Sequence, residues 1–520
     1  MASRLFLFFL AVYLLTSYGR LDNNDLEVVF QTTRSIAEDG SFAIGDTPQG
    51  RYIKSQNPPF DVMRGSDGRY YSWFGVGHAV LGLPGYWLGQ TFAGLFPDTL
   101  SVGEWERMWV CLTNAFLGAL VVVLLYRTGR RLGYSSKIAT IAVVAYGLGT
   151  LAWQHARGGF PGTACTLALA LGLLGITSYA RRGERRHLWV ASSALACGVA
   201  IRMPTAVGAL ILGIWALFAI LRRRDWLGLV AFGMPAAIGA GLLMWVNDSR
   251  FGDPLETGYG EVTEGGFFQF PIWLGLLFQI ASPARSFILY ALPSTLGLFT
   301  IWKFGRKCRA EAIVVFSIFI AYLLFHASIH GWHGAWTWGP RYLLPALALL
   351  TLPLMAFLEW AAQKRWRTAI AAVLLLASFG IQALGVAVHY GTAIEVSQHG
   401  AARRYPQRAE PELWLMVLMR EPLFCPIRVH AKILAVKLRW PRPETYDAED
   451  LFGAAGPPIQ ARERSETGIP NSGFEHIGTV MVWKTGSFWL CSLIVIWMIA
   501  VGVLGLRLVH CVLREPRAAS

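Results

Sequence analysis

A short run of acidic and amide residues follows the first apolar stretch of the chain, Leu5–Tyr18. It reads Leu21-Asp22-Asn23-Asn24-Asp25-Leu26-Glu27. A carboxylate beside such a stretch is suited to take the proton of a hydroxyl group, because general-base catalysis needs a positioned acceptor within hydrogen-bond reach. We select Asp25 as the candidate base. Asp is also a favoured N-cap, so a structural role at the start of a helix over Asp25–Glu38 is the alternative.

The chain that positions this run is strongly apolar. Of its 520 residues, 54% are hydrophobic and 15% are charged, and the mean hydropathy is +0.43. These values exclude a soluble globular class and predict an all-α polytopic membrane protein. A span needs about 20 apolar residues, and about twelve stretches are candidates. They are Leu5–Tyr18, Met108–Tyr126, Ile138–His155, Phe160–Tyr179, Leu188–Ile201, Pro204–Leu221, Trp226–Val246, Ser286–Trp302, Ala312–Ile329, Tyr342–Leu358, Thr368–Val388 and Ser487–Val509.

Basic residues gather in every second gap between these stretches. The clusters are Arg127/Arg130/Arg131/Lys137, Arg181/Arg182/Arg185/Arg186, Arg222/Arg223/Arg224, Lys303/Arg306/Lys307/Arg309 and Lys364/Arg365/Arg367. The positive-inside rule assigns such short loops to the cytoplasm. Topology therefore explains the net charge of +14, and nucleic acid is not expected as a partner. To keep the second and third clusters on one side, the chain must turn at Arg202-Met203-Pro204 between two short spans.

The remaining gaps then face outward, and the first of them covers residues 19–107. Within it, Gly75–Phe96 is apolar but interrupted by Gly and Pro. A crossing there would move every later basic loop outside, so we predict a helix in the outer interface. For the same reason we predict that Phe267–Pro283 lies in the outer interface and does not cross the membrane. We expect a transmembrane catalytic module over 1–388, an outside segment or small subdomain over 389–486, and a final span with a cytoplasmic tail over 487–520.

Four patches carry a resemblance to a known family. They are Asp25 with Arg34, Gly40 and Phe42; Tyr70-Tyr71-Ser72-Trp73-Phe74-Gly75-Val76-Gly77; Asn247-x-x-Arg250-Phe251-Gly252-x-Pro254-x-x-x-Gly258-Tyr259; and Trp336-x-Trp338-Gly339-Pro340-Arg341-Tyr342-Leu343-Leu344-Pro345. In this order they resemble the outer loops of the GT-C superfamily of membrane glycosyltransferases. The resemblance is to the glycosyltransferase 39-like group with the lipid A aminoarabinose transferases and the protein O-mannosyltransferases.

The resemblance implies an enzyme of the cytoplasmic (inner) membrane whose active site faces the periplasm. It implies a GT-C fold that transfers a sugar, with inversion, from a polyprenyl-phosphate donor to a lipid, glycan or protein acceptor of the cell envelope. Expected partners are this donor, membrane lipids and the envelope acceptor. No cofactor is required by the pattern, and a divalent cation is left open. Two rivals remain: a flippase or transporter of a lipid-linked saccharide, and a non-catalytic subunit of an envelope polysaccharide assembly complex.

A lipid-phosphate donor needs cations, because charge develops on the departing oxygen and a fixed guanidinium stabilises it. Arginines at outer ends of spans are candidates, and snorkelling or an ion pair is the alternative for each. Arg202 stands out within apolar sequence, and Arg341 lies in the fourth patch. Arg69 is the nearest cation to Trp73, where the resemblance implies a lysine. The predicted donor-phosphate ligands are Arg202, Arg341, Arg69 and Arg250.

Aromatic and polar residues of the outer segments are candidates for sugar binding. Aromatic rings stack on sugar faces but also populate interfacial belts. Histidines such as His78, His155 and His333 are candidate metal ligands, or structural residues. The predicted substrate-binding residues are Asp22, Glu27, Arg34, Tyr70, Tyr71, Trp73, Tyr259, His333, Trp336, Trp338 and Tyr342.

Overall fold

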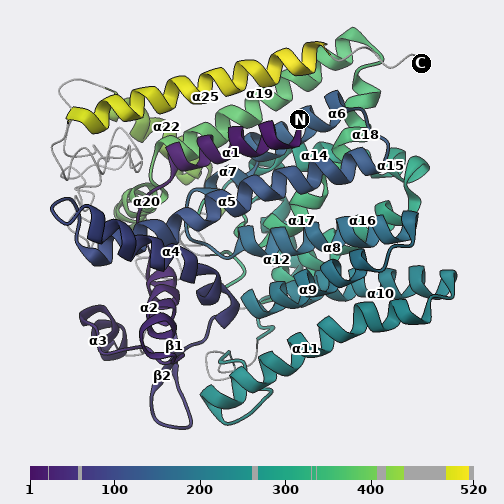
Figure 1. Ribbon diagram of the computed structural model, residues 1–520. Coiled ribbons are helices and arrows are strands. Elements are labelled where there is room, and N and C mark those ends of the chain that lie inside the picture. Colours follow the sequence, from purple (N-terminus) through teal and green to yellow (C-terminus); the bar gives the residue numbers. More distant parts are fainter. Residues whose placement is uncertain are drawn as a thin grey trace.

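The computed structural model describes residues 1–21, 23–56, 61–259, 267–329, 331–334, 337–406, 417, 419–438 and 488–514, with side chains of the last helix described over 495–511. The described chain is almost entirely helical (Figure 1). The predicted helix over Asp25–Glu38 is confirmed as α2 (Asn24–Asp39). The other elements up to α5 are α1 (Ala2–Thr16), α3 (Pro48–Ser55), β1 (Val62–Arg64), β2 (Tyr70–Ser72), α4 (Val76–Leu95) and α5 (Val102–Arg131).

Long apolar helices make this a multi-pass membrane protein. Six described helices are long and apolar enough to cross a membrane, or seven if one bent pair counts as a span. The six are α5, α8 (Gly162–Arg182), α10 (Thr205–Arg223), α11 (Trp226–Phe251), α16 (Arg309–Ser328) and α19 (Arg365–Ala387). The pair bends by 54° and joins η1 (Arg341–Leu343) and α17 (Leu344–Leu349) to α18 (Thr351–Ala361).

The expectation of about twelve spans is not confirmed, because several predicted stretches are shorter or broken helices. Shorter apolar helices are α1, α6 (Ser136–Gly149), α9 (Arg186–Ile201), α12 (Ile272–Ala281) and part of α25 (Phe488–Arg514). The predicted span Ile138–His155 divides into α6 and α7 (Leu151–Ala156). The predicted span Ser286–Trp302 divides into α13 (Phe287–Tyr290), α14 (Leu292–Phe299) and the start of α15 (Ile301–Lys307).

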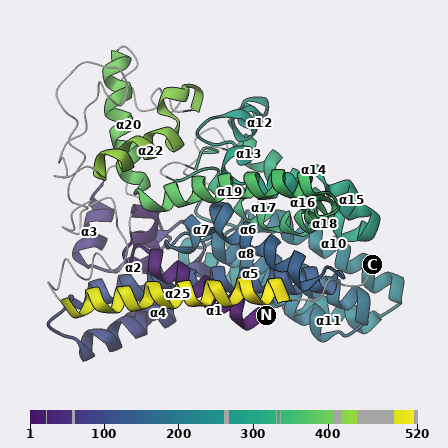
Figure 2. The same ribbon diagram turned by 90° about the horizontal axis from the view of Figure 1, so that it is seen from above.

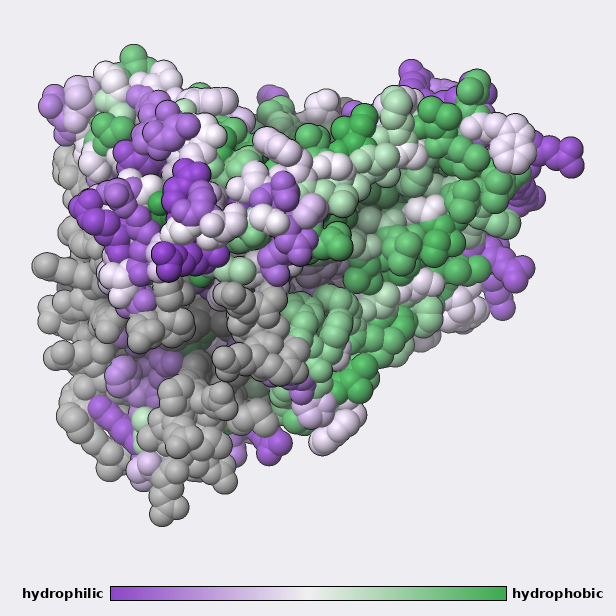
Figure 3. Space-filling view, turned by 90° about the horizontal axis from the view of Figure 1, so that it is seen from below, coloured by the Kyte–Doolittle hydropathy of each residue, from purple (hydrophilic) through white to green (hydrophobic). Residues whose placement is uncertain are grey.

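The bundle has two chemically different ends. In Figure 3 a broad apolar surface lies between two hydrophilic ends, as a protein embedded in a bilayer requires. The five basic clusters meet at one of them, at the right in Figure 1. Hydrogen bonds connect their turns: Arg181 to the carbonyl of Arg131 at 3.0 Å, Arg223 to that of Ala180 at 2.8 Å, and Lys307 to Gly133 at 3.5 Å and Glu359 at 3.3 Å. The alternation of loops that the sequence predicts is therefore present in the fold.

The opposite end carries α2, α3 and a β-hairpin. Strands β1 and β2 are antiparallel, with Val62 opposite Ser72, Met63 opposite Tyr71 and Arg64 opposite Tyr70. The all-α expectation missed this hairpin, because three-residue strands are too short to show an alternating pattern. In Figure 2, α20 (Tyr390–Arg404) projects beyond the bundle, and α22 (Pro426–Lys437), preceded by η3 (Pro422–Phe424), packs against α19. Helix α25 lies along α1.

The apolar segment Gly75–Phe96 forms the single helix α4, which is not among the six candidate spans. Two of its glycines, Gly85 and Gly89, face α5. A Cβ on Gly85 would lie 2.7 Å from the carbonyl oxygen of Trp109, and one on Gly89 would lie 2.4 Å from the Cα of Glu106. Small residues at this spacing let two helix backbones approach closely. The glycines that interrupt the sequence pattern thus serve packing, and the interfacial position of α4 stays a prediction.

The predicted turn at Arg202-Met203-Pro204 is confirmed. Helix α9 ends at Ile201, Arg202 has extended backbone angles, and α10 begins at Thr205. Pro204 disfavours a helical conformation in the residue before it, so the sequence ends α9 there. The break leaves Arg202 at the end of the bundle that carries α2.

Candidate active site

A cavity of about 280 Å³ lies at this end of the bundle. Segments that are distant in the sequence build its wall: the start of α2, the residues flanking the hairpin, the first turn of α4, the connection from α7 to α8, the break after α9, and η1. Its charged and polar lining residues are Asp25, Asp61, His78, His155, Arg202, Tyr259, Arg341 and Tyr342. The sequence predicted five of these as site residues: Asp25, Arg202, Tyr259, Arg341 and Tyr342.

Asp25 lies in the first turn of α2 and lines the cavity. Its carboxylate is 3.6 Å from the guanidinium of Arg341. The cap of α2 is Asn23, whose side chain accepts a hydrogen bond from the backbone N–H of Leu26 at 2.9 Å. The alternative that Asp25 is the N-cap is therefore wrong, since the helix end is satisfied by another residue. The Asp25 carboxylate is therefore not used as a helix cap and lines the cavity.

Asp61 is a second carboxyl group in the cavity, and the sequence analysis missed it. It precedes β1 with φ 52°, in the left-handed region that Asp tolerates better than most residues. Its side chain hydrogen-bonds to that of Asp25. Burial raises the pKa of Asp61 to about 7, the negative charge of Asp25 acts in the same direction, and Arg341 opposes both. Because burial and the neighbouring charge of Asp25 both disfavour its ionised form, Asp61 keeps its proton up to about pH 7.

Two arginines, Arg202 and Arg341, line the same cavity. The guanidinium carbon of Arg202 lies 4.4 Å from the ring centre of Tyr342, and that of Arg341 lies 5.0 Å from the same ring. Arg341 also donates a hydrogen bond to the Tyr342 hydroxyl at 3.2 Å. The Nε of Arg341 is buried and has no hydrogen-bond partner among the described residues. With one carboxyl group protonated, the two guanidinium groups outnumber the remaining carboxylate, so the cavity favours an anion.

An aromatic pair forms another part of the wall. The rings of Trp73 and Tyr259 stack with centroids 6.4 Å apart and an interplanar angle of 20°. Gly258 permits this contact, because its φ is +84° and a Cβ there would lie 3.0 Å from the Cα of Trp73. Flat aromatic surfaces of this kind bind the apolar faces of sugar rings.

Two histidines, His78 and the buried His155, line the same cavity. Nδ1 of His78 and Nε2 of His155 have no hydrogen-bond partner among the described residues. Asn114 fixes the segment after His155, because its amide donates to the carbonyl oxygens of Gly158 at 2.6 Å and Phe160 at 2.7 Å. No group of three or more His, Cys, Asp or Glu side chains that could hold a metal ion occurs in the described ranges.

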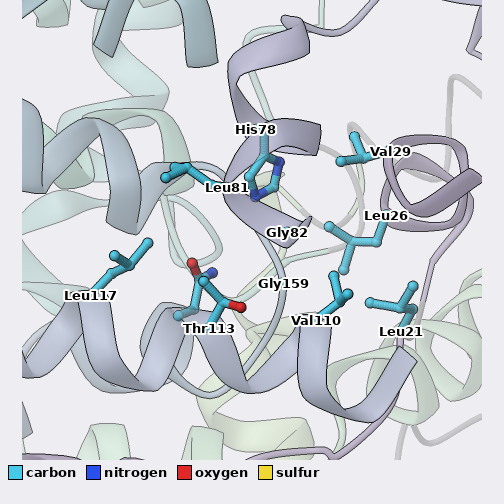
Figure 4. Close-up of a pocket in the computed structure, with 11 residues that line it drawn as sticks. Leu21, Leu26, Val29, His78, Leu81, Gly82, Val110, Thr113, Leu117 and Gly159 are labelled. Atoms are coloured by element: carbon cyan, nitrogen blue, oxygen red, sulfur yellow. The ribbon is translucent and has the colours of Figure 1, made fainter. Parts of the chain in front are cut away.

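A smaller pocket adjoins the cavity between α2, α4 and α5 (Figure 4). Leu26, Val29 and His78 line both spaces. Most of its other lining side chains are aliphatic, including Leu81, Val110 and Leu117, and its volume of about 20 Å³ is close to that of one water site. The charged side chains are therefore confined to the larger cavity.

Two of the predicted phosphate ligands, Arg69 and Arg250, do not line this cavity. Arg69 is exposed and pairs with Asp67 at 2.6 Å, and the pKa of Asp67 falls to about 2 because Tyr71, the Arg69 backbone and the Arg69 side chain hydrogen-bond to it. Arg250 is buried and donates to the carbonyl oxygen of Ser72 at 3.0 Å and to Asn247 at 2.8 Å, so it holds the hairpin against α11. Both arginines have local structural partners.

The remaining predicted residues are engaged elsewhere. Glu27 pairs with Arg107 at 2.6 Å, and Arg34 pairs with Glu38 at 3.0 Å. The Trp338 indole donates to Gln382 at 3.2 Å. Tyr70 and Tyr71 belong to β2, and the carbonyl oxygen of His333 accepts a hydrogen bond from Arg285 at 2.6 Å. Asp22 and Trp336 lie outside the described residues.

No family model and no curated protein matches this chain. Among solved structures, the chain is similar to ArnT from Cupriavidus metallidurans. Against the apo state the identity is 15% and the TM-score 0.46, covering 82% of this chain and 74% of that one. Against ArnT bound to undecaprenyl phosphate the identity is 16% and the TM-score 0.45, covering 82% and 76%. A similarity at this level carries no argument about activity, ligands or residue roles.

Proposed function

We propose that this protein is a membrane glycosyltransferase that moves a sugar from a polyprenyl-phosphate donor to a hydroxyl group of a lipid, glycan or protein. The observation that carries the proposal is the meeting of Asp25, Arg202 and Arg341 in one cavity. The sequence predicts the first as a base and the other two as phosphate ligands. Transfer from a phosphate leaving group requires a base and an anion site within one cavity.

In the proposed reaction, Asp25 takes the proton of the acceptor hydroxyl while its oxygen attacks the anomeric carbon. The bond from that carbon to the phosphate oxygen breaks, and its electron pair leaves with the polyprenyl phosphate. Attack from the face opposite the leaving group inverts the configuration. Arg202 and Arg341 stabilise the charge that grows on the phosphate, because guanidinium groups form strong charge-assisted hydrogen bonds with phosphate oxygens.

The surroundings of the cavity suit such a donor. The Trp73–Tyr259 pair offers a stacking surface for the sugar. Helix α4 exposes large apolar side chains beside the site, including Val80, Trp87 and Leu88, and we propose that it lies in the outer interface. The polyprenyl chain would then run along the lipid-facing spans while its phosphate reaches the two arginines.

We further propose that the shorter apolar helices complete a topology of about twelve spans. The basic end then faces the cytoplasm, and the cavity faces the outside of the cytoplasmic membrane. A lipid-linked donor is preferred to a nucleotide sugar, because the site is proposed to face outward.

The test uses the purified protein in detergent with a polyprenyl-phosphate sugar and candidate acceptors. We expect release of polyprenyl phosphate together with a glycosylated acceptor. Asp25→Asn should lower kcat by about 100-fold or more, since it removes the base but keeps the shape of the side chain. Asp98→Asn is the matched control, because Asp98 is an exposed residue of the same outer loop, and its activity should equal that of the wild type.

Full activity of a folded Asp25→Asn protein would remove Asp25 from its role. Transport of a lipid-linked saccharide across vesicles without cleavage of the sugar–phosphate bond would favour the flippase. Absence of turnover together with stable co-purification of another transferase would favour the assembly subunit.

A further inference from the structure

The carboxyl group of Asp61 is a half-buried ionisable group of the cavity that the proposed reaction does not use. Placing a second carboxylate next to a catalytic one costs free energy, because the two negative charges repel each other and burial weakens their hydration. The backbone nevertheless places it there. The carbonyl oxygen of Asp61 accepts a hydrogen bond from the N–H of Trp73 at 3.3 Å, so the strand that carries the aromatic wall also fixes Asp61.

Several elements present charged or titratable groups to Asp61. Helix α2 presents Asp25, η1 presents Arg341 and Tyr342, and the segment after α11 presents Tyr259. Arg202, His78 and His155 complete the polar lining of the cavity. Asp61 hydrogen-bonds to Asp25, and the guanidinium of Arg341 lies 3.6 Å from the Asp25 carboxylate. Asp25 therefore has one partner that can donate a proton in a hydrogen bond and one fixed cation.

We propose that Asp61 is a positioning residue that keeps the proton of the carboxyl pair and donates it in a hydrogen bond to Asp25. This inference rests on the proposed function. The arrangement orients Asp25 as the base. It also gives the cavity two guanidinium charges against one carboxylate, so that an anionic donor binds. When Asp61 loses its proton, the hydrogen bond is lost and a second negative charge appears beside Arg341, which weakens donor binding.

The decisive variant is Asp61→Asn, whose amide keeps a hydrogen-bond donor and cannot ionise. Asn also tolerates the left-handed backbone at this position, so the fold is retained. We expect the wild-type kcat/KM for a polyprenyl-phosphate sugar to fall about tenfold as pH rises above about 7, mainly through a higher KM for the donor. Asp61→Asn should stay active and lose this alkaline decline. Asp61→Ala should lower kcat below about pH 7, where Asp61 of the wild type still donates a hydrogen bond to Asp25.

A measurement of stability tests the carboxyl pair without any turnover. The pKa of Asp61 is about 7 in the fold, and about 3.9 when unfolded. Between these values the folded protein binds more protons than the unfolded chain, so its stability falls as pH rises from about 4 to about 7. The apparent Tm in detergent should therefore fall over this range in the wild type and in Asp98→Asn, and fall less in Asp61→Asn.

The outcomes separate this inference from the proposed function. If Asp61→Asn abolishes activity like Asp25→Asn, or keeps the alkaline decline of the wild type, the positioning role is refuted while the glycosyltransferase stands. If no polyprenyl-phosphate sugar is turned over but the Tm difference is present, the proposed function fails and the shared proton stands. An equal pH dependence of Tm in wild type and Asp61→Asn overturns the shared proton.

Discussion

At the scale of single residues, Arg202 and Arg341 make different contacts although they lie over the same ring. Arg341 is 3.6 Å from Asp25 and bonds to the Tyr342 hydroxyl, so it serves both the base and the anion site. Arg202 lies 4.4 Å from the Tyr342 ring centre, at the break where α9 ends. Loss of Arg202 should therefore affect the donor alone, whereas loss of Arg341 should affect the donor and the base.

We predict that Arg202→Ala lowers kcat/KM for the donor by about 100-fold, because it removes one fixed charge from the leaving group. Arg341→Ala should lower it further, and should also alter the pH dependence of kcat, since Arg341 opposes the raised pKa of Asp61. Steady-state kinetics with a polyprenyl-phosphate sugar measure both effects. Arg69→Ala is the control and should change kcat/KM by less than about twofold, because its exposed ion pair contributes little. An inactive Arg69→Ala beside an active Arg202→Ala would move the phosphate site to the hairpin.

At the scale of elements, the position of Arg202 depends on a contact between the backbones of α4 and α9. A Cβ on Gly77 would lie 2.7 Å from the carbonyl carbon of Ala200 and 2.8 Å from the nitrogen of Ile201. These atoms directly precede Arg202. The helix that we propose in the outer interface thus also supports the donor site, and this gives the glycines at its start a function beyond flexibility.

We predict that Gly77→Ala separates α4 from α9 and lowers kcat/KM by about 100-fold, because a displacement of about 1 Å at a reacting centre costs that much. Gly94→Ala is the matched control in the same helix, since a Cβ there meets nothing within 4 Å. That control should keep full activity and should not lower the apparent Tm, because Ala favours a helix more than Gly does. Equal activity of the two variants would show that the close approach is not needed.

Several elements follow from local sequence rules, whereas the site depends on tertiary contacts. The break at Arg202 was predictable for two reasons. Pro204 disfavours a continuous helix, and the basic clusters before and after the break must lie on the same side of the membrane. Asp61 was not predictable, since nothing near it in the sequence distinguishes it from exposed acids such as Asp67. Its environment arises only when the hairpin brings it to Asp25. For the same reason, sequence reasoning selected Arg69 and Arg250, whose partners Asp67 and Asn247 become apparent only in the fold.

At the scale of the whole molecule, the basic clusters and the cavity lie at opposite ends of the helical bundle, and this determines the predicted membrane topology. Hydrogen bonds connect the turns of four basic clusters at one end of the bundle, and the cavity lies at the other end. The orientation of the bundle in the membrane therefore decides the side of both. We predict that reporter fusions after Gly183, Arg223 and Arg306 report cytoplasmic, and that one near Gln398 reports outside.

A fusion near Pro97 is the critical one, because it follows α4 directly. If α4 lies in the outer interface, this fusion reports outside, like the one near Gln398. If α4 crosses the membrane, the fusion reports cytoplasmic. The first turn of α4 would then line the outward-facing cavity while its last turn reaches the cytoplasm. Gly75 and Gly77 press against the end of α9, so α4 and Arg202 lie on the same side at that point. If both Pro97 and Gly183 reported cytoplasmic, the chain between them would have to cross the membrane an even number of times. The helices α5, α6 with α7, and α8 supply three proposed crossings, which is why we expect Pro97 and Gly183 on opposite sides.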